Sequence, residues 1–243
     1  MAGTTGRALA IQTRLLRAGF GVACLVASVA CRAPAPVIAP QCPANPIPAG
    51  SEAMVDALRT AVFPALHLQA GMHVADIGVG GGRWTFALAM AIGENGLVYG
   101  TDIDAATLQR LKDAPHLPPE AAKIEPRLVH TAFETGLDDL PEASLDRILM
   151  VDSLCFDQTV DRTAAAKYLH GFLRVLKHGG QFVHHMDCRC ATTLADVEQL
   201  FTAAGFSGKP TRIPVPCSAV PTTTCGTGAN EERARYVGVF TRP

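Results

Sequence analysis

The sequence predicts an α/β fold, a doubly wound and mostly parallel sheet of seven strands. Short apolar runs alternate with segments of helical periodicity, a pattern typical of parallel sheets with helices on both faces. The first clear run, His73–Ile77, leads into a glycine-rich turn, Gly78–Gly82, with a helical segment behind it. Glycines let a backbone approach a ligand closely, so this turn predicts a ligand at the carboxyl edge of the sheet.

The remaining elements follow in a regular order. A helix begins near Ser51, which can cap it, and carries Met54, Leu58 and Val62 on one face. Further helices are expected over Trp84–Ile92, Ala105–Lys112, Ala164–Leu176 and Leu194–Ala204. Strands are expected over Met72–Ile77, Gly96–Asp102, Arg127–Thr131, Asp146–Asp152, Gln181–His185, Lys209–Val215 and Arg235–Thr241.

The first fifty residues have a different composition from the rest of the chain. Arg7, Arg14 and Arg17 precede an uncharged apolar run over residues 18–30, which is too short to span a membrane. Small residues end the run, and Cys31 follows. A basic segment, a short apolar segment and a small-residue end are typical of a secretory signal peptide.

We therefore expect a signal peptide over residues 1–30, a proline-rich tether over 31–50 and a folded domain over 51–243. The signal resembles that of a bacterial lipoprotein, in which Cys31 becomes the lipidated first residue. Ser28 stands where such signals usually carry Leu, so cleavage without a lipid is the alternative. The protein is expected to be exported, either periplasmic or anchored to a membrane; a cytoplasmic location is the alternative.

Length and charge narrow the possible partners. A chain of 243 residues can bury one substantial core. Its formal net charge of −1 offers no bulk attraction to nucleic acid, and no basic stripe interleaved with aromatic residues is present. We therefore expect a small-molecule partner rather than a nucleic acid, and oligomeric state is left open.

An acidic residue narrows the range of ligands that the glycine turn could bind. Asp102 ends the next predicted strand, about twenty residues after the turn, where a carboxylate can accept both hydroxyls of a ribose. The turn has neither the Gly-Lys-Ser/Thr of a phosphate-binding loop nor a clean G-x-G-x-x-G fingerprint. These features favour a nucleoside ligand, and a dinucleotide used by a dehydrogenase is a more distant alternative.

Four segments together resemble the class I S-adenosylmethionine-dependent methyltransferases, of the type 11/25-like group. They are VADIGVGGG, VYGTDID, LPEASLDRILMVDSL and LRVLKHGGQFV. They stand in the family's order and at about its spacing, and the resemblance covers roughly residues 55–240. It implies a Rossmann-like methyltransferase fold with an antiparallel last strand, and S-adenosyl-L-methionine as the cofactor.

The resemblance also implies which residues bind the cofactor. The expected set is Asp76, Gly78, Gly80, Gly82, Asp102, Ile103, Ala132, Phe133 and Asp152. Asp76 would fix the turn or meet the cofactor's amino group, and Ala132 and Phe133 would contact adenine. The family often has an Asp at this last place, so adenine selectivity is expected to rest on backbone groups and Phe133. The structural alternatives are a helix cap at Asp102 and a core position for Phe133.

Direct in-line methyl transfer to a small-molecule acceptor is the expected reaction. It depends mainly on alignment, and a base is needed only if the acceptor is protonated. Asp152, His184 and His185 are the candidate catalytic residues, and neighbours on a strand point to opposite faces, so at most one histidine faces the site. The alternative is an exported, catalytically degenerate nucleoside-binding protein of the same fold.

Six cysteines follow the signal region: Cys42, Cys155, Cys188, Cys190, Cys217 and Cys225. Cys188 and Cys190 follow the strand Gln181–His185, and Cys217 and Cys225 lie in the last connection, at the same edge of the sheet; in an exported protein they suggest one or two disulfides at the rim of the site. The alternatives are free thiols, a metal site with His184 or His185, and a thiol-ligand site for a soft acceptor such as a metalloid. The two close cysteine pairs fit no standard zinc spacing, so no metal is expected.

Overall fold

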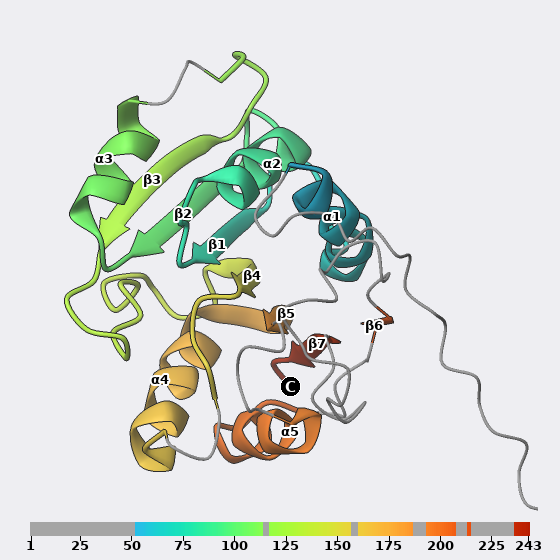
Figure 1. The fold of residues 1–243 in the computed structure, drawn as a ribbon, viewed down its shortest axis with the longest axis vertical. Coiled ribbons are helices and arrows are strands. Elements are labelled where there is room, and N and C mark those ends of the chain that lie inside the picture. Colours follow the sequence, from blue (N-terminus) through green and yellow to red (C-terminus); the bar gives the residue numbers. More distant parts are fainter. Residues whose placement is uncertain (1–51, 114–116, 157–159, 187–192, 208–212, 215–235) are drawn as a thin grey trace, which may run out of the picture. The chain divides into compact units, whose positions relative to one another are not determined.

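Strands and helices alternate along the chain in the expected order (Figure 1). The computed structural model describes residues 52–113, 117–156, 160–186, 193–207, 213–214 and 236–243. The strands are β1 (His73–Ile77), β2 (Leu97–Asp102), β3 (Lys123–Leu128), β4 (Leu145–Val151), β5 (Leu176–Met186), β6 (Ile213–Pro214) and β7 (Tyr236–Thr241). The helices are α1 (Glu52–Leu66), α2 (Arg83–Ile92), α3 (Ala105–Asp113), α4 (Arg162–Val175) and α5 (Leu194–Ala203). The predicted signal peptide and tether lie outside the described residues.

The strands form one mixed sheet in the order β3-β2-β1-β4-β5-β7-β6. All pairings from β3 to β5 are parallel, and β7 runs antiparallel to β5. A mostly parallel sheet with an antiparallel last strand is therefore confirmed. Of the strand expected over residues 209–215, only Ile213 and Pro214 are described, and they pair with β7. A full seventh strand is accordingly not confirmed.

The order of the strands creates a binding position. From β1 the chain adds β2 and β3 on one side, and then returns to add β4 and β5 on the other side. The segments that follow β1 and β4 therefore leave the sheet in opposite directions. In open α/β sheets, ligands bind at the carboxyl end of such a switch point.

The third strand begins four residues earlier than the sequence predicted. We expected it over Arg127–Thr131, after Pro126, but β3 includes Pro126 opposite Gly100 of β2. Among the described strands β3 lies at the edge of the sheet, where one side of the backbone has no partner strand. A proline is tolerated there because its missing N–H need not break a ladder. The predicted start of this strand was therefore wrong.

Helices cover both faces of the sheet, as the alternating pattern predicted (Figure 1). Neighbouring residues of β4 show this directly, because Ile148 packs into the core beneath α4 and α5 whereas Leu149 packs beneath α1 and α2. Phe172, Phe182 and Phe201 lie at the centre of the first core, with ring centroids 5.1–5.4 Å apart along the chain of contacts. Each central strand is thus buried on both faces, which explains its nearly continuous apolar sequence.

Side-chain caps fix the residues at which α4 and α5 begin. The Asp161 side chain accepts hydrogen bonds from the backbone N–H groups of Thr163 and Ala164 at the start of α4. Thr193 and Asp196 form a reciprocal capping box at the start of α5. Such caps satisfy N–H groups that have no partner inside the helix. None of the described helices has the length and apolar content needed to cross a membrane.

Candidate functional site

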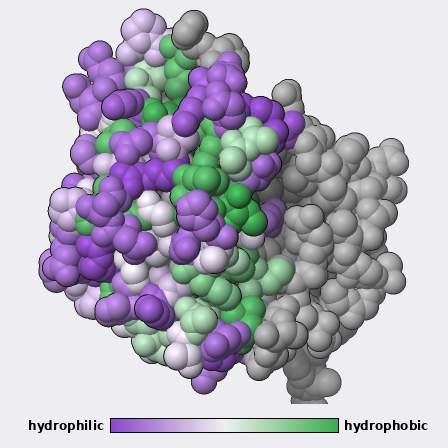
Figure 2. Space-filling model, turned by 90° about the vertical axis from the view of Figure 1, so that its left-hand side faces the viewer, coloured by the Kyte–Doolittle hydropathy of each residue, from purple (hydrophilic) through white to green (hydrophobic). Residues whose placement is uncertain are grey.

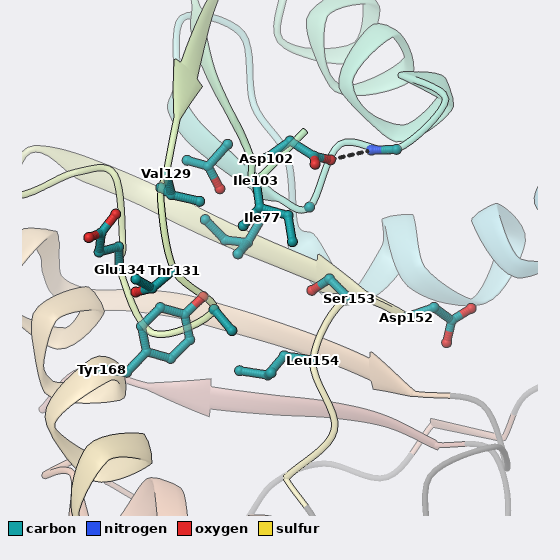
Figure 3. Close-up of a pocket in the computed structure, with 14 residues that line it drawn as sticks. Ile77, Asp102, Ile103, Val129, Thr131, Glu134, Asp152, Ser153, Leu154 and Tyr168 are labelled. Atoms are coloured by element: carbon teal, nitrogen blue, oxygen red, sulfur yellow. Dashed lines mark hydrogen bonds between the residues drawn. The ribbon is translucent and has the colours of Figure 1, made fainter. Parts of the chain in front are cut away.

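A cavity of about 320 Å³ lies at the switch point of the sheet, beside the carboxyl ends of β1, β2 and β4 (Figure 3). It is lined by Ile77, Gly78, Gly80, Thr101, Asp102, Ile103, Val129, Thr131, Ala132, Glu134, Asp152, Ser153, Leu154 and Tyr168. The lining residues come from strand ends and the segments that follow them, except for Tyr168, which belongs to α4. The fold therefore brings together segments that are far apart in the sequence.

Backbone hydrogen bonds hold the glycine turn against the end of β2. The N–H groups of Gly78 and Val79 both donate to the carbonyl oxygen of Thr101, at 2.8 and 3.0 Å. Gly78 has a φ of 79°, and a Cβ added there would lie 2.4 Å from the Cβ of Ser153. A side chain at this position would therefore collide with the segment after β4, so glycine is required.

Gly80, unlike Gly78, has open space where a Cβ would stand. Its φ is 49°, and an added Cβ would meet no atom within 4 Å. Because Gly80 lines the cavity, the backbone of the turn is open to a ligand at this position. Gly82 is not among the lining residues and forms the N-cap of α2.

Asp102 lines the cavity, and its carboxylate oxygens can accept further hydrogen bonds. Its Oδ2 accepts a hydrogen bond from the Gly80 N–H at 3.0 Å, and its Oδ1 accepts one from the Asp104 N–H at 2.9 Å. A carboxylate oxygen can accept two hydrogen bonds, so each oxygen keeps a position for a ligand. The helix-capping role belongs instead to Asp104, whose Oδ1 accepts from the N–H of Ala106. Ile103, between the two acids, is 63% exposed and lines the cavity.

Asp76 lies beneath the turn and does not line the cavity. It is 2% exposed, and its Oδ2 accepts a hydrogen bond of 2.6 Å from the Thr85 hydroxyl. Burial raises the pKa of Asp76 to about 7, the Thr85 hydrogen bond opposes that rise, and the nearby Asp102 charge adds to it. The bond joins the end of β1 to the first turn of α2. Of the two predicted roles, this geometry matches fixing the turn.

The segment after β3 forms another wall of the cavity. Ala132 lines it together with Thr131 and Glu134, and the Glu134 carboxylate accepts a 2.6 Å hydrogen bond from the His130 N–H. Phe133 is not a lining residue; its ring packs edge-on against Tyr168 with centroids 5.8 Å apart. Phe133 is partly buried and packs against the core beneath α4, and its contact with adenine stays a prediction.

The catalytic candidates lie at different depths. Asp152 lines the cavity, and its carboxylate points away from Ile77 and Tyr168 (Figure 3). The His185 Nε2 lies 3.8 Å from the Asp152 Oδ1, and the Asp152 N–H donates to the His185 carbonyl at 3.0 Å. His184 packs against Phe156, and burial lowers its pKa to about 3. Neither histidine is a lining residue, but His185 contacts the cavity through Asp152.

The loop that carries Asp152 is also restrained covalently. Cys155, the residue after the cavity-lining Leu154, is disulfide-bonded. The other seven of the eight cysteines lie outside the described residues, and so does its partner. Within the described ranges, no group of three or more His, Cys, Asp or Glu residues is arranged to hold a metal ion.

Exposed apolar side chains lie near the site. Among the described residues, the large apolar side chains with high exposure are Met90, Ile103 and Leu128, and the last two lie at the carboxyl ends of β2 and β3. Figure 2 shows hydrophobic residues gathered in a strip along the middle of one face, with hydrophilic residues beside it. Ile103 is thus an exposed apolar residue in the lining of the cavity.

Part of the chain matches a known protein family, and its fold is similar to that of solved structures. Residues 74–180 match the family model of a methyltransferase domain. Similar solved structures include a SAM-dependent methyltransferase from Aquifex aeolicus, with 16% identity, a TM-score of 0.52, and coverage of 77% of this chain and 90% of that one. An S-adenosylmethionine-dependent methyltransferase from Mesorhizobium loti has 17% identity and a TM-score of 0.53, with 76% and 98% covered.

A third similar structure is a possible exported protein from Bordetella parapertussis, with 16% identity and a TM-score of 0.53, covering 78% of this chain and 67% of that one. At such identities the likeness to solved structures shows the fold. No curated protein matches the chain.

Replacing Asp76 by Asn should change how stability depends on pH. The pKa of Asp76 rises from 3.8 to about 7 on folding, so its contribution to stability is fully present below about pH 4 and is lost as the pH rises to 7. The free energy of unfolding of the wild type should therefore fall across this window relative to Asp76→Asn, by up to about 4 kcal/mol. Urea unfolding at pH 4.5, 6 and 8 measures this difference. Parallel pH profiles for the two proteins would contradict a protonated Asp76.

Proposed function

We propose that this protein is an S-adenosylmethionine-dependent methyltransferase that acts on a small-molecule acceptor. The observation that carries the proposal is the cavity between the glycine turn and Asp102 at the switch point of the sheet. The match of residues 74–180 to a methyltransferase domain supports the choice of cofactor for this cavity. The net charge of −1 supports a small molecule over a nucleic acid as the acceptor.

The cavity suits the cofactor part by part. The open backbone at Gly80 suits the methionine part, which must pass close to the turn. The spare acceptor positions of Asp102 suit the two ribose hydroxyls. Apolar walls suit the flat adenine ring, and Ile77, Val129 and Leu154 provide them. A volume of about 320 Å³ lies within the usual range of small-molecule sites.

Methyl transfer mainly requires that the cofactor and the acceptor be aligned. S-adenosylmethionine, when bound, supplies a methyl group that is already activated for direct in-line transfer. The acceptor's lone pair forms the new bond to the methyl carbon, and the electron pair of the broken carbon–sulfur bond stays on sulfur. The contribution of this chain is to hold the two reactants in line, through the turn after β1 and the loop after β4.

Asp152 is the proposed base for a protonated acceptor. Asp152 belongs to the lining, and its carboxylate points away from Ile77 and Tyr168, so the acceptor is proposed to bind on that side (Figure 3). It would accept the proton that the acceptor loses. His185, 3.8 Å from the Asp152 Oδ1, would hold that carboxylate in place and stabilise its charge when the imidazole is protonated. His185 is therefore a positioning residue in this proposal.

The site is proposed to act outside the cytoplasm. Basic residues, a short apolar run and Cys31 have the layout of a lipoprotein signal. The disulfide at Cys155 supports the same location, because such bonds persist in oxidising compartments. In this proposal a lipidated Cys31 anchors the protein, and the prolines that follow form a tether.

Binding of S-adenosylhomocysteine is the first test. The wild type should bind it in a calorimetric titration, and Asp102→Asn should bind it about tenfold or more weakly, because the amide loses charge-assisted hydrogen bonds to the ribose. Asp104→Asn is the matched control, since Asp104 caps α3 and is not a lining residue. Absence of heat and of a thermal shift with the wild type would contradict the proposed function. Equal affinity of the wild type and Asp102→Asn would contradict only the ribose contact.

Transfer of a labelled methyl group tests the proposed base. Incubation of the wild type and a small-molecule extract with methyl-labelled cofactor should label an acceptor, which chromatography and mass spectrometry then identify. Asp152→Asn should lower the rate about 100-fold for a protonated acceptor, because the base is lost, while the variant still binds S-adenosylhomocysteine. His178→Gln, which changes an exposed histidine at the Pro243 carbonyl, should keep full activity. Tight cofactor binding without any labelled product would favour the degenerate binding protein instead.

Processing of the N-terminus tests the proposed location. In a bacterial host with a lipoprotein pathway, the chain should be recovered from the membrane fraction, begin at Cys31 and take up labelled fatty acid. Cys31→Ala should abolish that labelling, because the thiol to be acylated is lost. A full-length, unlabelled chain in the cytoplasm would contradict export.

A further inference from the structure

Tyr168 holds a hydroxyl in the cavity that the site described so far does not use. Of the described lining residues, it alone comes from a helix. Its side chain is 5% exposed, and its ring packs edge-on against Phe172 and Phe133, with centroids 4.6 and 5.8 Å away. These contacts on two sides fix the ring, and they fix the position of the hydroxyl with it.

The hydroxyl has no hydrogen-bond partner among the described residues. Burial alone raises the pKa of Tyr168 above its ordinary value, so the group stays a neutral donor across the physiological range. Figure 3 shows it pointing from α4 into the cavity. The hydroxyl is open to the cavity, so it is available to donate a hydrogen bond to a ligand atom that accepts one.

The position of Tyr168 identifies the part of the ligand that it meets. Tyr168 contacts Phe133, in the segment after β3, and it lies across the cavity from Asp102 (Figure 3). A nucleoside with its ribose at Asp102 would extend its base between the apolar walls toward this segment. The edge of that base would then face the phenol.

We propose that Tyr168 donates a hydrogen bond to a ring nitrogen of adenine and is a specificity-determining residue of the cofactor site. This assignment rests on the proposed function. The ring nitrogens N1, N3 and N7 of adenine carry no hydrogen and accept hydrogen bonds, so a phenol that remains protonated is a suitable partner. The contact supplies a polar recognition element in a wall where the sequence offered only backbone groups and Phe133.

Calorimetric titration of Tyr168→Phe with S-adenosylhomocysteine tests the assignment. The affinity should fall about fivefold to tenfold, as expected for one hydrogen bond. The thermal midpoint without ligand should not fall, because the hydroxyl has no partner to lose in the empty protein. Tyr99→Phe is the matched control: Tyr99 is also buried, but it lies on β2 beside Arg127 and does not line the cavity. It should bind like the wild type.

Analogues of S-adenosylhomocysteine that carry CH in place of N1, N3 or N7 identify the atom. One of the three should bind the wild type as weakly as the parent ligand binds Tyr168→Phe, and the substitution should then cost nothing further. Equal affinity of the wild type and Tyr168→Phe for S-adenosylhomocysteine would overturn the assignment, and so would a loss on substitution that none of the analogues removes. Failure of the wild type itself to bind would overturn the proposed function, and this assignment with it.

Discussion

The contact between the turn after β1 and the end of β2 is the constraint on which the rest of the site depends. Thr101 accepts two backbone N–H groups of the turn, and Asp102 accepts a third, from Gly80. The carboxylate that would bind a ribose is therefore positioned by the same turn that leaves room for the rest of the ligand. Asp76 supports this arrangement from below through Thr85, because the bond between them ties β1 to α2. This support places Asp76 in a buried position, and burial raises the pKa of its carboxyl group.

The two faces of the sheet contribute differently to the cavity. The sheet edge supplies backbone groups and carboxylates, which can meet the polar parts of a ligand. The core beneath α4 supplies rigidity, because its aromatic rings hold Tyr168 at a fixed depth. The loop after β4 joins these parts: Asp152 has a φ of 51°, which is unusual for a residue with a side chain, and the disulfide at Cys155 restrains the chain three residues later. Backbone strain of this kind is often found at functional sites.

The parts of the site that were predictable depend on local sequence. The glycine turn and the acid at the end of the second strand can be recognised because their spacing follows from one strand–turn–helix unit. The start of β3 was missed because the tolerance for Pro126 depends on which strand lies at the sheet edge. Glu134 and Tyr168 were missed for a similar reason. Nothing near Tyr168 in the sequence indicates that α4 turns this residue toward a cavity built by other segments. The different surroundings of His184 and His185 likewise follow from packing.

The close approach of Gly78 to Ser153 has a consequence for the order of events in a catalytic cycle. A Cβ at residue 78 would lie 2.4 Å from that of Ser153, so only glycine lets the two loops approach each other this closely. The first loop belongs to the proposed cofactor site, and the second faces the proposed acceptor. In the proposed function, a shift of the first loop on cofactor binding would therefore be passed to the second. Such coupling favours a compulsory sequence, in which the cofactor enters first and its demethylated product leaves last.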